Sequence, residues 1–191
     1  MLIFSFDGVT AETMDQKYQE VIEKAARLGY EYEERFFGCS QSVVAALIEA
    51  FGIGRPDILR VSTAFAGGVA RRGILCGAVS GGLIVISFLT GRDDLEFFEQ
   101  YQRGMKFAEK FYNKFEEKFG TINCKEIQKI KFGKIFDLQR PEEREDLHEL
   151  MKSNPDGCQA VTGEGARLAA EVIVEILKHG PPLARILAQY P

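Results

Sequence analysis

The chain of 191 residues contains no tryptophan, two histidines and only four cysteines. Four cysteines are too few for a disulfide scaffold, and a chain of this length buries a full core without covalent crosslinks. The net charge of −4 argues against a nucleic-acid or anionic-membrane partner, since both select basic surfaces. The two histidines, His148 and His179, leave little room for a histidine-based metal site. Any metal ligands are therefore expected to be sulfur or carboxylate.

The only long uncharged segment covers residues 73–91 and approaches the length of a membrane span. It is interrupted by glycines and serines, and its strongly apolar part, Leu83 to Leu89, covers only two helical turns. We therefore expect no membrane insertion, and we interpret the segment as a helix buried inside a bundle. The start of the chain has no basic region of a signal peptide, so a cytoplasmic location is expected, where structural disulfides are rare.

Apolar residues recur at helical spacing through most of the chain, and few stretches alternate as half-buried strands do. This pattern predicts an all-α fold, a single-domain helical bundle over residues 1–191 with a C-terminal tail at 180–191. The first helix is expected to start at a Thr10 cap and to end at Gly29. The later helices are predicted to end at Phe51 and to cover 56–65, 73–91, 94–119, a short segment after Asn123, 141–151 and 159–178.

An aromatic stripe runs along the predicted helix 94–119 at mostly four-residue steps: Phe97, Tyr101, Phe107, Phe111, Phe115 and Phe119. We interpret this stripe as core packing. A homodimer interface is the alternative.

Each cysteine lies at or near the start of a predicted helix: Cys39, Cys76, Cys124 and Cys158. A helix N-terminus presents free N–H groups and the positive end of the helix dipole, and both lower the pKa of a thiol. Four converging thiolates would repel one another and need a cation, which favours a metal centre, with iron–sulfur first and zinc second. Converging pairs, with Cys39 and Cys76 as the first choice, would instead support dithiol–disulfide exchange. A third interpretation is that the cysteines are inert small core residues.

A non-redox function is a further alternative, in which the helical protein binds a small ligand. The pocket would lie between a glycine-rich loop and the small face of the central helix, at Gly67, Gly68, Gly77 and Gly81. Arg71 and Arg72 could meet an anion there, although a solvated loop is the favoured interpretation of this pair. The acidic runs 31–34 and 142–146 and His148 are predicted on solvated surfaces, so general acid–base catalysis has little support.

Three segments carry a family resemblance: Gly38-Cys-Ser-Gln-Ser-Val-Val44, Phe65-Ala-Gly-Gly68 and Cys76-Gly-Ala-Val-Ser-Gly81, followed by two single cysteines. In these features the chain resembles the C_GCAxxG_C_C family of redox-active proteins over residues 15–178. The resemblance implies a redox role for the four cysteines and an unknown redox partner. A related domain occurs in split-Soret cytochromes, which implies an iron or iron–sulfur centre. The chain has no C-x-x-C-H motif, so covalent haem is excluded.

Overall fold

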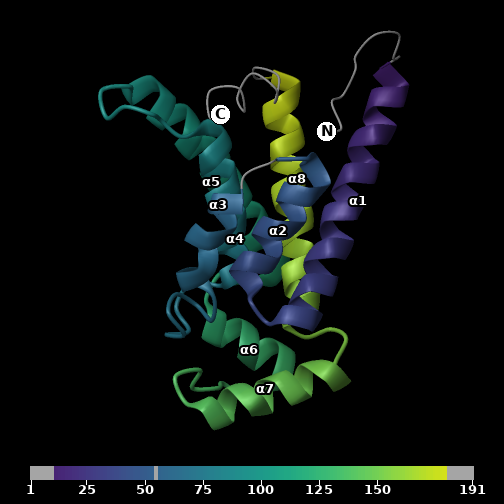
Figure 1. Cartoon of the computed structure of the whole chain (residues 1–191), viewed down its shortest axis with the longest axis vertical. Coiled ribbons are helices and arrows are strands. Elements are labelled where there is room, and N and C mark those ends of the chain that lie inside the picture. The colour runs from purple at the N-terminus through teal and green to yellow at the C-terminus, as the bar shows by residue number, and fades with distance from the viewer. Residues whose placement is uncertain (1–10, 54–55, 180–191) are drawn as a thin grey trace.

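The computed structural model describes residues 11–53 and 56–179, and this part of the chain is built from helices without a strand (Figure 1). The all-α prediction is confirmed. In chain order the helices are α1 (Ala11–Phe36), α2 (Cys39–Phe51), α3 (Pro56–Val61), the 3-10 helix η1 (Ser62–Phe65), α4 (Gly77–Thr90), α5 (Phe98–Phe119), α6 (Cys124–Phe132), α7 (Pro141–Ser153) and α8 (Cys158–His179). The predicted Thr10 cap and the tail 180–191 lie outside the described residues.

Helices α1 and α8 run antiparallel along one side of the bundle, and glycines set how closely they approach (Figure 1). A Cβ on Gly29 would lie 2.9 Å from the Cβ of Ala166, and one on Gly163 would lie 2.8 Å from the Ala26 carbonyl oxygen. The prediction that the first helix ends at Gly29 is wrong, because this glycine is a packing contact inside α1. The helix continues for two further turns to Phe36, which carries it to the lower end of the bundle.

Helix α4 is the buried glycine-rich helix that the sequence predicts, and α2, α5 and α8 pack around it. It begins at Gly77 rather than at Gly73, because Gly73 has a positive φ of 70° and Leu75 and Cys76 pair with the segment before α6. The loop before it is left-handed. Five successive residues, 67–71, have positive φ angles between 49° and 74°. Right-handed helix cannot form through such a run, and three of its members are not glycine.

Helix α5 packs into the core from Gly104 onward, and Gly104, Phe111 and Phe115 are buried. Its N-terminal part projects away from the bundle (Figure 1), and Phe97 and Tyr101 are exposed there. The prediction that the whole aromatic stripe packs in the core is therefore wrong at this end. The helix also starts at Phe98 rather than at residue 94.

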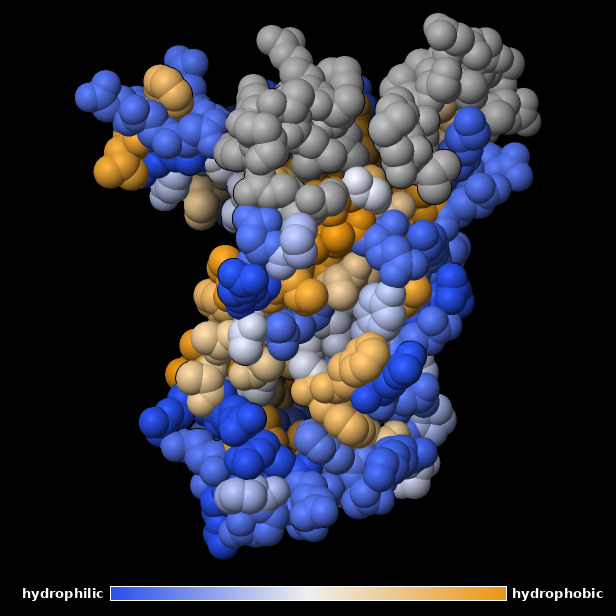
Figure 2. Space-filling view, viewed as in Figure 1, coloured by the Kyte–Doolittle hydropathy of each residue, from blue (hydrophilic) through white to orange (hydrophobic). Residues whose placement is uncertain are grey.

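Helices α6 and α7 lie crosswise beneath the bundle and form a lower layer (Figure 1). The side chain of Asn123 caps α6 as predicted, accepting hydrogen bonds from the N–H groups of Lys125 and Glu126. A second, smaller apolar cluster joins this layer to the bundle above: Cys124, Phe136, Leu138, Leu147 and Met151, with Phe37, Phe132 and Cys158 against it. Figure 2 shows hydrophilic side chains covering the lower layer and a hollow above it. Two cysteines thus lie at the junction of the two layers.

No helix among the described residues has the length and apolar character needed to cross a bilayer, α4 included. The expectation that the uncharged segment does not insert agrees with this result.

Candidate functional site

All four cysteines lie at helix N-termini, as the sequence predicts. Cys39, Cys124 and Cys158 are the first residues of α2, α6 and α8, and Cys76 is the N-cap of α4. All four are free thiols. Three of these helices start at the lower end of the bundle and the fourth starts in the layer beneath it (Figure 1), so the four N-termini face one region.

Backbone pairing fixes Cys76 beside Cys124. The Cys76 N–H donates to the Ile122 carbonyl at 2.8 Å, and the Cys124 N–H donates to the Ile74 carbonyl at 2.9 Å. These bonds flank an isolated antiparallel bridge between Leu75 and Asn123. This pairing brings together two cysteines that are 48 positions apart in the chain. Local sequence patterns do not reveal it.

Contacts at two glycines show what packs against this pair of cysteines. The Sγ atom of Cys39 occupies the space that a Cβ on Gly77 would need. A Cβ on Gly68 would lie 2.8 Å from the Cβ of Cys124. Gly81 lies against the backbone of α2 at Ser40, one turn beyond Gly77. Of the four predicted ligand-binding glycines, Gly67 lines a cavity, whereas Gly77 and Gly81 face α2 and Gly68 is buried against the loop.

A cavity of about 500 Å³ lies between the bundle and the lower layer, and Cys39, Cys124 and Cys158 line it. Cys76 is buried behind this lining. The charges of Cys76 and Cys124 nevertheless raise the pKa values of both Cys39 and Cys158, after larger effects of burial and of Glu33. Cys76 and Cys124 therefore lie within electrostatic reach of both Cys39 and Cys158.

Burial governs the thiol pKa values and outweighs the helix N-termini. It raises the pKa of Cys76 to about 12, although the N–H groups of Ala78 and Val79 act in the opposite direction. It also raises the pKa of Cys39 well above its ordinary value, against a lowering by the Gly67 N–H. The prediction that the helix N-termini leave the thiol pKa values lowered is wrong for the cysteines, because desolvation of a thiolate is the larger effect.

A buried amide side chain is oriented toward the sulfur of Cys124. The N–H of Phe136 donates to Oε1 of Gln128 at 2.9 Å, which leaves Nε2 facing Cys124 Sγ at 3.4 Å. This hydrogen bond lowers the pKa of Cys124, although burial is the larger effect and raises it. Such a fixed donor favours charge on the sulfur. Gln128 could not be predicted from the sequence, because a glutamine in a short helix is usually a surface residue and nothing near it indicates a buried contact with Cys124.

Glu33 is buried at the same cavity, and the prediction that residues 31–34 are all at the surface is wrong for it. Its carboxyl accepts a hydrogen bond from Ser42 Oγ at 3.1 Å and one from the Gly38 N–H. Burial raises its pKa to about 8 despite these bonds. A signal exists in the sequence: Glu33 follows Ile22, Ala26 and Gly29 at helical spacing, which becomes visible once the helix continues past Gly29.

Ionisation of Glu33 makes the stability of the metal-free, reduced protein depend on pH. The folded protein keeps a proton that the unfolded chain releases near pH 4.5, so the free energy of unfolding falls as pH rises toward 8. Between pH 6.5 and 8 we expect a loss on the order of 1.5 kcal/mol, and we expect Glu33→Gln to abolish it. Urea unfolding at several pH values measures this change.

Between pH 6.5 and 8, the change in stability can be attributed to Glu33 rather than to the other titrating groups of the cavity. The lowered pKa of His148, caused mainly by burial, costs stability only below its ordinary value of 6.5. The raised thiol pKa values act in the same direction as Glu33, but chiefly above pH 9, where thiols of the unfolded chain ionise. An unfolding free energy that stays constant from pH 6.5 to 8 would contradict the assignment of Glu33.

His148 also lines the cavity, and the prediction that it lies on a solvated surface is wrong. Its ring is half-buried and stacks on Phe37 with the centroids 4.0 Å apart. Phe37 has a positive φ of 54° in the short turn between α1 and α2. A left-handed conformation is unfavourable for a bulky residue and is found where surrounding structure imposes it, often at functional sites.

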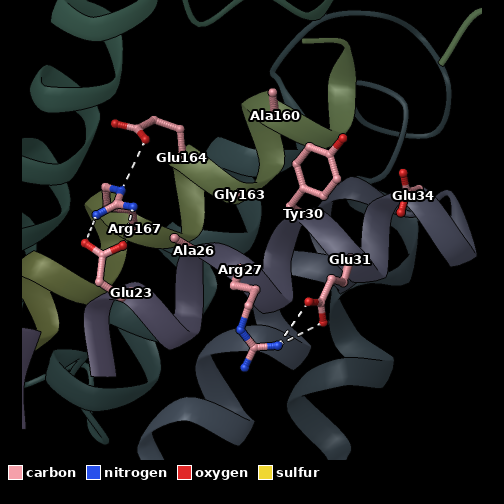
Figure 3. Close-up of a pocket in the computed structure, with 10 residues that line it drawn as sticks. All are labelled: Glu23, Ala26, Arg27, Tyr30, Glu31, Glu34, Ala160, Gly163, Glu164 and Arg167. Atoms are coloured by element: carbon pink, nitrogen blue, oxygen red, sulfur yellow. Dashed lines mark hydrogen bonds and ion pairs between the residues drawn. The ribbon is translucent and has the colours of Figure 1, made fainter. Parts of the chain in front are cut away.

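A separate surface hollow lies between α1 and α8, and its charged groups pair with one another (Figure 3). Arg167 bridges Glu23 and Glu164, and Arg27 pairs with Glu31. This hollow contains no cysteine. The cavity at the lower layer, which three cysteines line, is therefore the candidate site among the described residues.

The residues that could hold a metal are the four cysteines, which offer only sulfur ligands. Among residues 11–53 and 56–179, no three cysteine, histidine or acidic side chains already meet around the position of one ion. Three of the four cysteines line one cavity, and Cys76 lies outside that lining.

The fold and the site define a small helical protein with four free thiols at helix N-termini, three of which line one cavity. A family model described as "Putative redox-active protein (C_GCAxxG_C_C)" matches residues 37–172, and the chain belongs to this family. An "Uncharacterized protein" of Archaeoglobus fulgidus is 31% identical over 115 residues, which cover 56% of this chain and 76% of the relative. No solved structure matches the chain.

Proposed function

We propose that this redox-family protein is an electron-transfer protein whose four cysteines hold an iron–sulfur centre. The observation that carries this proposal is the placement of four free thiols, each at a helix N-terminus, three of them lining one cavity and the fourth buried beside it. The matching family supports the redox role. The metal itself, the identity of the ligands and the electron partner are parts of the proposal.

The raised thiol pKa values favour a cation-dependent centre over a reactive thiol. A nucleophilic cysteine needs an accessible thiolate near neutral pH, and exchange enzymes lower the thiol pKa to obtain it. Here burial and the mutual effects of the sulfurs raise it instead. Thiolates in this region therefore need a compensating positive charge, which bound metal supplies.

The remaining groups suit a buried one-electron centre. An iron–sulfur centre, when bound, supplies one-electron chemistry at a potential set by burial and by hydrogen bonds to its sulfur ligands. The Nε2 of Gln128 donates to Cys124 Sγ, and the N–H of Gly67 donates to Cys39. Leu147 and Met151 keep water from the inner wall of the cavity. The two N–H donors stabilise negative charge on sulfur, and neither is acidic enough to protonate a thiolate.

Thiol–disulfide exchange is the second candidate, and one contact favours it. The sulfur of Cys39 lies directly against Gly77, the residue that follows Cys76. This makes Cys39 and Cys76 the expected pair. We further propose a cytoplasmic location, which the free state of all four thiols supports, and a separate redox protein as the electron partner.

Anaerobic purification from iron-supplied cells, followed by iron, acid-labile sulfide and zinc analysis, tests the proposal. We expect iron and sulfide together with a visible absorption band that bleaches on reduction. Folded protein that contains neither iron nor sulfide would contradict it. Zinc alone would indicate a structural metal site, and a Cys39–Cys76 disulfide formed reversibly by oxidant would favour the second candidate.

A further inference from the structure

Two arginines and one histidine lie at the mouth of the cysteine cavity. Arg71 reaches it from the left-handed loop, and Arg144 and His148 reach it from one face of α7. Burial is the main cause of the lowered pKa of His148; the charges of Arg144, Lys152 and, least, Arg71 lower this pKa further, and Glu149 raises it. The three side chains therefore share one electrostatic neighbourhood at the opening.

Neither arginine has an acidic partner within ion-pair distance among the described residues. Arg144 is held by main-chain acceptors instead, since its Nη1 donates to the carbonyls of Leu138 at 2.8 Å and Gln139 at 3.1 Å. These bonds hold the guanidinium at the opening without an ion pair, although the charge of Arg144 also acts on Glu142. The acceptors are neutral, so a charge-assisted hydrogen bond to an anion remains available.

Other described arginines, such as Arg60 and Arg72, also lack an ion pair, whereas three arginines do have acidic partners. Arg167 and Arg27 lie beside glutamates in the hollow between α1 and α8 (Figure 3). Arg140, four positions from Arg144, pairs with Glu142. Acidic residues outnumber lysine and arginine by 28 to 24, so partners are plentiful. Arg71 and Arg144 are distinguished by lining the same cavity, where their two positive charges favour the binding of an anion.

Aromatic and apolar side chains also line this cavity. The stacked rings of Phe37 and His148 form one side, and the buried Leu147 and Met151 form another. A volume of about 500 Å³ lies in the usual range for small-molecule sites. A bare inorganic oxyanion would leave these side chains uncovered, whereas a carboxylate or phosphate with a planar carbon body would cover them.

Glu33 is the acidic group that lines the same cavity. Because burial raises its pKa to about 8, its carboxyl is protonated at neutral pH and does not repel an anion. Two non-glycine residues with left-handed backbone, Phe37 and Arg71, flank the opening. Such conformations cost free energy and are characteristic of ligand-binding segments.

We infer that this cavity binds a small organic anion, with its acid group paired to Arg71 and Arg144 and its planar body against Phe37 and His148. The bound molecule lies between solvent and the three cysteines that line the cavity. The inference goes beyond the proposed redox centre and does not depend on it, because every contact named here is made by side chains outside the cysteine set.

Isothermal titration calorimetry of the protein as isolated, at pH 7, tests the inference with benzoate and phenyl phosphate as probes. Benzamide is the neutral counterpart of benzoate and has the same planar body. We expect saturable binding of at least one anion at low millimolar concentration and no binding of benzamide. Arg71→Gln and Arg144→Gln should each weaken that binding about tenfold or more. The matched control is Arg72→Gln, since Arg72 is the neighbouring exposed arginine outside the cavity lining.

The inference is overturned if no anion binds, if benzamide binds as well as benzoate, or if the Arg72 variant loses as much affinity as the other two. The comparison of benzoate with benzamide uses the unaltered protein, so it stands even if a variant fails to fold. Metal analysis of the same samples separates the two proposals. Iron without anion binding overturns only this inference, and anion binding without iron overturns only the proposed centre.

Discussion

Replacing Gly81 by alanine is expected to lower the free energy of unfolding by about 2 kcal/mol or more, although alanine is the better helix former. A Cβ at this position would lie 2.6 Å from the Ser40 carbonyl oxygen and 2.9 Å from the Cβ of Val43. Backbone atoms of a packed helix cannot move aside as the end of a flexible side chain can. Helices α2 and α4 must separate, and that loss exceeds the gain of about 1 kcal/mol in helix propensity.

Urea unfolding of the reduced protein measures this effect, and Gly38→Ala is the matched control. Gly38 has a φ of −144°, and its nearest neighbour would lie 3.5 Å from the added Cβ. We expect the control to change the unfolding free energy by about 0.5 kcal/mol or less. Equal effects at the two positions would contradict close packing of α2 on α4 as the cause.

The Gly81 variant also reports on the site. Cys39 lies at the start of α2 with its sulfur against Gly77, one turn before Gly81 in α4. A displacement of α2 therefore moves Cys39 relative to Cys76. We expect the variant to retain less iron than the Gly38→Ala control when both are isolated anaerobically.

Local signals predicted much of the fold. Apolar spacing located the helices, Asn123 identified the start of α6, and the uncharged segment identified the buried α4. The positions of all four cysteines at helix N-termini also followed, because capping residues, glycines and prolines mark helix starts within a few residues.

Glycine produced the main error, because its physical meaning depends on distant residues. At Gly52, Gly120 and Gly133 it ends a helix with a positive φ, as predicted for the first two. Gly29 instead allows α8 to pack closely against α1, and the residues near Gly29 in the sequence give no indication of this contact. Ending the helix there also hid Glu33, which lies one turn later on the inward face.

The arrangement of the cavity depends on contacts between segments far apart in the chain. The lower layer brings Arg144 and His148 of α7 beneath the end of α1, and the bridge of Leu75 with Asn123 brings two cysteines together. Nothing local distinguishes His148 from a surface histidine, since its neighbours Glu145 and Glu149 are exposed. The four cysteines could be predicted as candidates, but the groups that tune them could not.

Serine in place of any one of the four cysteines is expected to reduce the iron content of the anaerobically isolated protein about tenfold or more. Serine preserves the shape of the side chain but replaces the soft sulfur ligand that iron–sulfur centres require. The cysteines form no crosslink, so each substitution should leave the helical fold intact at a cost of about 1 kcal/mol. Iron and sulfide analysis measures the loss, and far-ultraviolet circular dichroism verifies the fold.

Met151→Leu is the matched control. Met151 also contributes a buried sulfur to the cavity, but a thioether is a poor ligand for an iron–sulfur centre. Its replacement preserves volume and should leave the iron content unchanged. Cys76 gives the sharpest result, since it lies behind the cavity lining and has the thiol with a pKa raised to about 12. Loss of iron in Cys76→Ser would mean that a bound cation draws this buried sulfur into the centre. Full retention of iron in Cys76→Ser, or in any of the other three variants, would contradict a four-cysteine ligand set.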